Sequence, residues 1–387
     1  MSLPSVSIQL QNGLLGQVGI GDDGVAGLIC SGPAPANLTL GAPVMITSVD
    51  QAINQYGIST TTNAYRHIKQ FYDEAGTGAE LYIMIVPSAT TMIAMCDKTQ
   101  AFAATLLTYG GGKIRLLGVA KDPGSGYVPV VTAGIDQDVL GAMTNADALA
   151  AQFQGEYKPV RILLEGSAFN DTVASLQDLT LSSFNHVGIV LGSDTKSGSG
   201  CVGLALGRAA KVPPQRNIGR VKDGPLTGIT EAYLGSKTVD TDMTVGDLGT
   251  VNDKGYIFMR GFTGRSGFFW NDDKMAALPT DDYNSLARGR VIDKAIVIAY
   301  STYVNEILDE IQVDSNGQIS TAIIKSLQQL ITNAINIAMG DEISGFQAFI
   351  DPTQNVIATG QLNIVMSITP VGYSKQIIVQ LGFANPA

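Results

Sequence analysis

The chain has 387 residues, of which 45% are hydrophobic and 15% charged, so it can bury the cores of two or three domains. Its 34 acidic and 24 basic residues give a net charge of −10 without any run of Lys or Arg, which argues against a nucleic-acid partner. With only two histidines and three widely spaced cysteines among small or apolar neighbours, we expect buried, reduced thiols and no metal site.

The N-terminal segment, residues 1–23, carries a strand pattern ahead of the first compact unit. Val6, Ile8 and Leu10 alternate with polar residues, and the turn dipeptide Asn12-Gly13 follows. No basic region precedes an apolar one, so we expect no secretory signal and synthesis in the cytoplasm. The segment fits either an edge strand of the chain's own sheet or an arm that pairs with another molecule. We predict an arm, with the glycines after it acting as a hinge.

Residues 24–224 alternate between strand and helix patterns and predict an α/β domain. Short apolar runs occupy 81–87, 113–120, 160–166 and 186–193. Helical patterns occupy 62–75, 96–109, 141–155, 170–181 and 200–211. Continuous apolar runs separated by amphipathic helices are typical of a mostly parallel sheet that is covered on both faces.

The rest of the chain predicts an α+β region. Residues 225–268 are rich in Gly, Thr and Asp and fit bridging loops with a few antiparallel strands. Within 269–370 we predict long helices at 284–311 and 321–339, the second capped by Ser320. Alternating strands at 361–370 and 374–383 predict a terminal hairpin, with residues 371–387 as a C-terminal arm strand. No stretch reaches the roughly 18 apolar residues of a membrane span, so we expect no membrane insertion.

One glycine-rich loop favours an alternative function. Gly198, Gly200 and Gly203 follow a predicted strand and open a helix, with Asp223 about twenty residues further on, as in a dinucleotide-binding oxidoreductase. Three features argue against dinucleotide binding. The loop follows the fourth predicted strand and not the first, the connection from strand to helix is longer than a tight turn, and Pro213-Pro214 follows the helix in place of a second strand. We therefore expect no cofactor there.

We expect no catalytic residues elsewhere either. The paired carboxylates Asp272-Asp273 and Asp281-Asp282 lie in a polar stretch, where we predict that they are solvated. No base, nucleophile and metal ligand can be assembled into one cleft from the sequence.

The helix predicted at 321–339 has one apolar stripe and one polar face with few charges. The polar face includes Lys325, Gln328, Gln329 and Thr332 and carries no acid. A solvated helix usually carries more charge. The pattern fits either a helix half-covered by its own subunit or a helix presented to a protein partner.

The C-terminal third combines three features in a fixed order. The stretch ARGRVID at 287–293 opens the first long helix, and a second amphipathic helix follows. The ending GQLNIVMSITPVGYSKQIIVQLGF then runs through a glycine, a strand, a Pro turn and a last strand. In these features the chain resembles the tail-sheath family of contractile phages, pyocins, extracellular injection systems and type VI secretion machines. In the N-terminal half, VAGLI at 25–29, the strands at 160–166 and 186–193, and GLALGRAAKVPP at 203–214 are similar as well.

This resemblance implies a structural subunit that is not an enzyme. Such subunits stack as hexameric rings around an inner tail tube and contract to drive the tube through a target envelope. Baseplate and terminator proteins would be further partners, and no nucleotide is consumed. Terminal arms add strands to neighbours, which assigns Val6, Ile8, Leu10, Ile377, Val379 and Leu381 to inter-subunit pairing. A C-terminal-domain helix faces the tube, which assigns Lys325, Gln328, Gln329 and Thr332 to that contact. Another tail component, such as a tube or baseplate protein, stays the second alternative.

Overall fold

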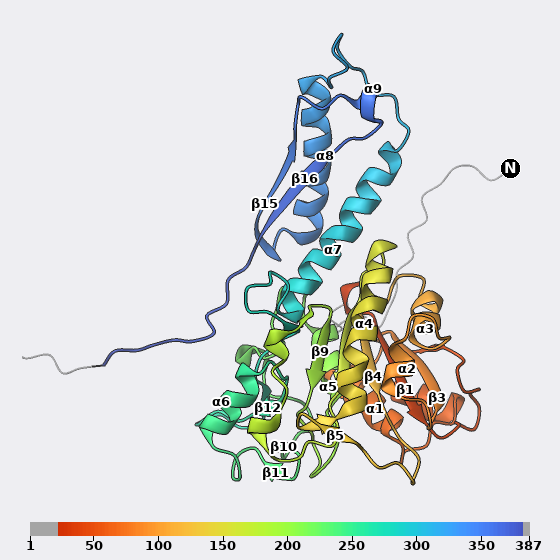
Figure 1. Cartoon of the computed structure of the whole chain (residues 1–387), viewed down its shortest axis with the longest axis vertical. Helices are drawn as coiled ribbons and strands as arrows, with labels where there is room; N and C mark the ends of the chain where they lie inside the picture. The colour runs from red at the N-terminus through yellow and green to blue at the C-terminus, as the bar shows by residue number, and fades with distance from the viewer. Residues whose placement is uncertain (1–21, 382–387) are drawn as a thin grey trace, which may run out of the picture.

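The computed structural model describes residues 22–381, which form a broad N-terminal domain and a narrow C-terminal domain along one long axis (Figure 1). The predicted arm residues Val6, Ile8 and Leu10 lie outside the described residues. Within them, no helix is both long enough and apolar enough to cross a membrane.

A six-stranded sheet organises the N-terminal domain. Its strands run in the order β2-β3-β1-β4-β7-β9, and every neighbouring pair is parallel except β2 with β3. All the strands except β2 and the end of β3 are buried along their length, as their continuous apolar sequences predict. Their bounds are β1 (Ala26–Gly32), β2 (Val44–Ile46), β3 (Leu81–Pro87), β4 (Leu116–Ala120), β7 (Arg161–Glu165) and β9 (Val187–Val190).

Helices cover the sheet in two groups. One group is α1 (Asn63–Ala75) with α5 (Val202–Lys211), and the other is α2 (Met92–Cys96), α3 (Ala103–Tyr109) and α4 (Gln137–Gly155). The two groups lie on opposite faces of the sheet. The crossover from β1 to β3, which contains α1, runs toward one edge of the sheet, whereas the crossovers from β3 to β4 and from β4 to β7, which contain α2, α3 and α4, run toward the other edge. Because crossovers are right-handed, the reversal of direction places their helices on opposite faces. The sequence prediction of a doubly covered α/β sheet is confirmed.

Two of the predicted helices differ from the structure. Residues 170–181 contain only the 3-10 turns Val173–Ser175 and Leu179–Leu181, so the helix predicted there is wrong. The side chains of Asn170 and Asp178 accept hydrogen bonds from backbone N–H groups two residues on, and such local bonds compete with helix formation. The pattern at 96–109 is divided between α2 and α3 for the same reason, since Asp97 accepts from the Thr99 N–H.

The bridging region is built from short antiparallel pairs, as predicted, and one helix that was not. The pairs are β10 (Tyr233–Leu234) with β11 (Lys237–Thr238) and β12 (Met259–Arg260) with β13 (Phe269–Trp270). The helix α6 (Val245–Asp253) begins at a capping box between Thr244 and Asp247. Two further pairs are β5 (Val131–Thr132) with β6 (Ile135–Asp136), and β8 (Ser183–Phe184) with β14 (Ala276–Ala277).

The C-terminal domain packs two helices against a hairpin. Ser320 caps α8 (Thr321–Met339), as predicted, and α7 (Leu286–Tyr303) ends earlier than the predicted 311. The hairpin consists of β15 (Ile343–Ile350) and β16 (Ile364–Pro370), with the short α9 (Val356–Thr359) between them. The predicted terminal hairpin is therefore wrong: β16 pairs with β15, and residues 371–381 form no strand. The strand immediately after α8 is the nearer partner along the chain, and it was not predicted.

Helix α7 joins the domains through a buried ion pair. The Arg161 guanidinium at the start of β7 is 1% exposed and binds both carboxylate oxygens of Asp293, at 2.6 and 2.7 Å. It also donates to the carbonyls of Asn185 and Gly289. A Cβ on Gly289 would lie 2.7 Å from the guanidinium carbon, so only glycine leaves room for Arg161.

Further contacts surround this pair on α7. The ring of Tyr300 stacks on Tyr157 with centroids 4.1 Å apart, and Lys294 binds Asp23 at 2.7 Å and Glu342 at 2.8 Å. These contacts tie the beginning of the described chain, the sheet domain and the hairpin domain to one helix. We infer that the two domains move as one body.

Replacing Asp293 by Ala should lower the free energy of unfolding by about 3–5 kcal/mol, because the Arg161 charge stays buried without its partner. Urea unfolding at neutral pH measures this loss. The exposed Asp282→Ala is the matched control and should change stability by less than about 0.5 kcal/mol. Removing both charges, as Arg161→Met with Asp293→Leu, should recover much of the loss. A loss below about 1 kcal/mol in Asp293→Ala would show that the pair does not hold the domains together.

Candidate assembly interface

The place where a doubly wound sheet commonly binds ligands is filled by the protein's own side chains. Open α/β sheets bind at the carboxyl ends of their strands, beside the point where the strand order reverses. Here Glu165, at the end of β7, accepts hydrogen bonds from Asn63, His67 and Ser199 and from the Lys121 N–H. Burial disfavours ionisation of Glu165, yet His67 and Arg66 hold its pKa below the usual value.

The glycine-rich loop packs against this same cluster. A Cβ on Gly200 would lie 1.8 Å from the Val190 carbonyl oxygen, and one on Gly203 would lie 2.2 Å from that of His67. The Gly200 N–H donates to the Gly166 carbonyl, and the Gly203 N–H donates to Nδ1 of His67. The glycines are therefore explained by close packing, and the two amides that a pyrophosphate would use are engaged within the protein.

The paired acids at 272–273 are not solvated, which corrects the sequence prediction. Asp272 and Asp273 are both buried and both accept from the Asn217 side-chain amide at 2.7 Å. Burial and the Asp272 charge raise the pKa of Asp273 to about 7. Asp272 binds Lys375 at 2.7 Å, and although burial opposes ionisation, Lys375 lowers the pKa of Asp272. The pair anchors the C-terminal segment.

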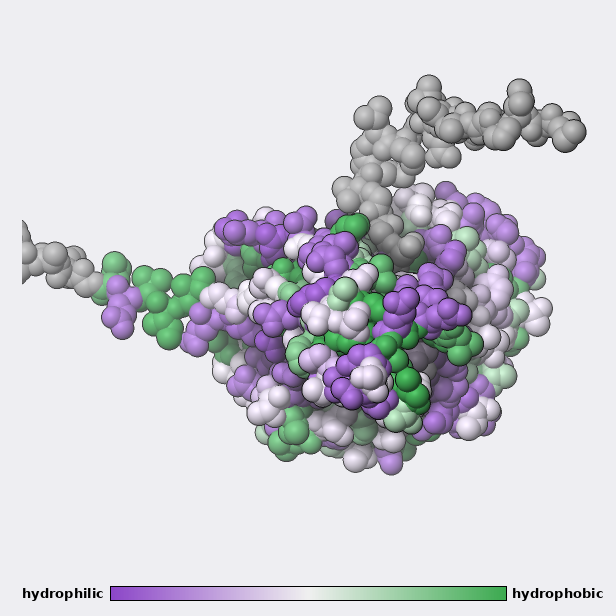
Figure 2. All heavy atoms as spheres, turned by 90° about the horizontal axis from the view of Figure 1, so that it is seen from above, coloured by the Kyte–Doolittle hydropathy of each residue, from purple (hydrophilic) through white to green (hydrophobic). Residues whose placement is uncertain are grey.

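From Ser374 onward, the described C-terminal segment leaves the body and is exposed throughout. Figure 1 shows it running away from the domains, and Figure 2 shows apolar residues along it. Its root is held by the Tyr373 hydroxyl, which donates to the Gln215 carbonyl, and by the Lys375–Asp272 pair. Beyond the root, Ile377, Ile378 and Val379 are exposed, and Leu381 is 96% exposed. The sequence did not identify the two root residues as anchors.

The hairpin whose strand β16 leads into this root offers a second exposed surface. Ile350, Ile364 and Ile368 on one face pack against α7 and α8. On the other face, Phe349 lies opposite Val365, and both are exposed. Since β15 and β16 form a two-stranded sheet in the described chain, each has an edge without a partner strand.

The structure divides the four residues predicted to face the tube. Lys325 and Gln329 are exposed on α8. Gln328 and Thr332 are half-buried, since the Gln328 side chain donates to the Ala348 carbonyl of β15 and the Thr332 hydroxyl donates to the Gln328 carbonyl. The exposed face that contains Lys325 also includes two apolar residues that were not predicted, Leu330 and Ile337.

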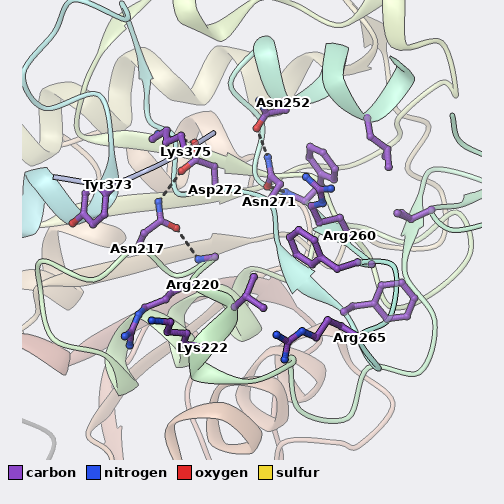
Figure 3. A pocket seen from close by; sticks show the side chains of 18 of the residues that line it. Asn217, Arg220, Lys222, Asn252, Arg260, Arg265, Asn271, Asp272, Tyr373 and Lys375 are labelled. Carbon is purple, nitrogen blue, oxygen red and sulfur yellow. Dashed lines mark hydrogen bonds and ion pairs between the residues drawn. The ribbon is translucent and has the colours of Figure 1, made fainter. Parts of the chain in front are cut away.

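A large cleft of about 2090 Å³ lies between the bridging region and the root of the C-terminal segment (Figure 3). Its apolar lining includes Met243, Phe258 and Phe268. Basic side chains outnumber acidic ones around it, although the chain as a whole is acidic. The basic residues are Arg216, Arg220, Lys222, Arg260, Arg265, Lys274 and Lys375, and the acidic ones are Asp240 and Asp272.

Comparison with protein families gives matches along nearly the whole chain. The model described as "DUF2586, N-terminal domain" matches residues 3–274, and the model described as "DUF2586, C-terminal domain" matches residues 282–387. No curated protein matches the sequence.

Solved structures with the same fold are contractile sheath proteins. The contracted helical sheath of the anti-feeding prophage aligns with a TM-score of 0.62 at 16% identity, covering 99% of both chains. The contracted sheath complex of PVC, an extracellular contractile injection system, gives 0.64 at 13% identity and covers 99% of this chain and 98% of the other. A sheath tail protein of Desulfitobacterium hafniense gives 0.51 at 10% identity over 95% and 100%. The fold predicted from the sequence pattern is thus the fold of sheath subunits.

Proposed function

Because the chain belongs to the DUF2586 family over both of its domains and shares the fold of contractile sheath subunits, we propose that it is a structural sheath subunit. Copies stack as hexameric rings around an inner tube and contract to drive the tube through a target envelope. Baseplate and terminator proteins lie at the two ends of the stack. The observation that carries this proposal is a rigid two-domain body from which an apolar, strand-patterned segment projects (Figures 1 and 2).

The projecting segment acts as an arm that adds a strand to a neighbour's hairpin. A strand edge leaves N–H and C=O groups that another extended segment can pair with. Each such hydrogen bond contributes only about 0.5–1.5 kcal/mol, so several are needed, together with burial of the exposed side chains. Ile377, Val379 and Leu381 share one face of an extended segment and supply that apolar surface. By its alternating sequence, Val6–Leu10 is the corresponding N-terminal arm.

Contraction then changes contacts between bodies and leaves each body folded. The buried Arg161–Asp293 pair and its neighbours hold the two domains together, while Tyr373 and Lys375 hold the described C-terminal arm to the body at its root. The energy for contraction comes from the difference between two packings of the same subunits, as in other rigid-body transitions. Such a machine needs no nucleotide in the sheath, which agrees with the filled crevice at the sheet's carboxyl edge.

Two adjacent prolines in the arm should abolish assembly. In an extended strand, the N–H groups of successive residues point to opposite edges, so one of residues 378 and 379 donates to the neighbouring strand. The double variant Ile378→Pro with Val379→Pro removes both N–H groups and therefore always removes that donor. We expect a folded monomer with an unchanged thermal midpoint and no sedimenting cylinders. Ile378→Thr with Val379→Thr keeps both donors and is the matched control. Ile8→Pro, or deletion of residues 1–12, should have the same effect through the N-terminal arm. Full-length cylinders from the proline variants would contradict the arm assignment.

The exposed face of α8 is the surface that we assign to the tube. Lys325 and Gln329 are its polar contacts, and Leu330 and Ile337 add apolar area. No acid lies on this helix, so an acidic or neutral tube surface meets no repulsion there. Gln328 and Thr332 support the face indirectly, through their hydrogen bonds with β15 and with α8 itself.

Lys325→Glu combined with Gln329→Glu should separate sheath from tube. When the variant is produced together with the tube protein, electron microscopy should show few sheathed tubes, because two negative charges replace one positive and one neutral group. Lys98→Glu with Gln100→Glu makes the same changes on exposed residues of the N-terminal domain and should leave sheathing normal. Sheathed tubes of normal length and yield from the α8 variant would place the attachment elsewhere, with the face of α7 as the next candidate.

A further inference from the structure

Arm exchange does not account for the basic cleft. Figure 3 shows Arg220 and Lys222 on one wall and Arg260 and Arg265 on another, with Tyr373 and Lys375 at a third side. Arg220 pairs with Asp223 and Lys375 with Asp272. Lys222, Arg260 and Arg265 have no carboxylate partner among residues 22–381. Arg260 lies over the Phe262 ring, 4.3 Å from its centroid, so its charge faces an aromatic ring and not an acid. Cations without carboxylate partners around an apolar hollow fit a partner that is both acidic and apolar.

A surface of that chemistry lies on the same chain, at the far end of the C-terminal domain. We call residues 304–310, between α7 and α8, the tip. The tip carries Glu306, Asp309 and Glu310 without a basic residue. Its three apolar side chains are open to solvent: Val304 is 39%, Ile307 is 65% and Leu308 is 98% exposed. None of the described contacts buries them.

We propose that the tip of a second copy occupies the basic cleft. The carboxylates of Asp309 and Glu310 meet Arg260 and Arg265, and the Leu308 side chain enters the hollow beside Met243 and Phe268. The two surfaces lie in different domains, so the contact joins unlike patches of two copies. A head-to-tail contact of this kind does not close on itself in a pair and can propagate along a helical assembly.

The proposed contact would also determine to which neighbouring copy each arm adds its strand. This part of the proposal rests on the proposed sheath function. Val371–Lys375, the root of the arm, lines the cleft. Just after the tip, Ile311 and Val313 pack in one cluster with Ile350 and Ile364 of the hairpin. A docked tip therefore brings its own hairpin next to the arm that leaves the cleft. Residues 372–381 can span about 33 Å when extended.

Charge reversal tests the pairing directly. Arg260→Glu with Arg265→Glu reverses the cleft, and Asp309→Lys with Glu310→Lys reverses the tip; all four side chains are exposed, so folding should be preserved. Each reversal should raise the critical concentration for cylinder formation at least about tenfold, because like charges then meet at the interface. The quadruple variant should recover assembly to near the wild-type level. Lys98→Glu with Lys113→Glu changes the charge equally outside the cleft and should polymerise normally.

The outcomes are distinguishable. Normal assembly of either reversal, or failure of the quadruple variant to recover, would overturn the tip-to-cleft contact while leaving the sheath function intact. Loss of assembly in the cleft reversal alone would mean that another acidic partner fills the cleft, which also overturns the proposal. If the wild-type protein forms no cylinders, the sheath function fails, and this contact fails with it.

Discussion

The Arg161 guanidinium and the Asp293 carboxylate lie within 2.6 Å of each other where the two domains meet, and the remaining architecture depends on that contact. An unpaired charge at this depth would cost several kcal/mol, so the sheet domain and α7 stay together or lose much of their stability. Gly289 is required because any larger residue would displace the guanidinium. Helix α7 also packs within the C-terminal domain. Because the ion pair holds the first turns of α7 against the sheet domain, it also sets the position of the C-terminal domain relative to that sheet.

With the two domains held as one body, the surfaces open to a neighbour include the described C-terminal segment and the hairpin. The root of the arm is held by Tyr373 and Lys375, and the described residues beyond it expose apolar side chains that a monomer cannot bury. The hairpin that leads into this root has two strand edges without a partner strand in the described part of the chain. In the proposed assembly, each surface supplies in a neighbouring copy what the other lacks.

The sequence predicted the architecture better than the interface. Continuous apolar runs predicted the parallel sheet, and Ser320 predicted the start of α8, because burial and capping leave local patterns. The pairing of β16 with β15 was missed, since strand partners depend on packing that no local pattern records. Asp272 and Asp273 were predicted to be solvated, and only the fold shows that Asn217 and Lys375 enclose them. The basic cleft was also invisible, because its cations come from separated segments.

In the proposed assembly, a rigid subunit polymerises by adding its arm as a strand to a neighbour's hairpin. Electron cryomicroscopy of the polymer formed by the purified protein would reveal this pairing. We expect striated hollow cylinders in which residues 22–370 superpose on the isolated subunit as one body and residues 374–381 form a strand beside a neighbour's β15–β16 hairpin. Smooth thin tubes, isolated oligomers, or cylinders in which each arm folds back onto its own hairpin would contradict it.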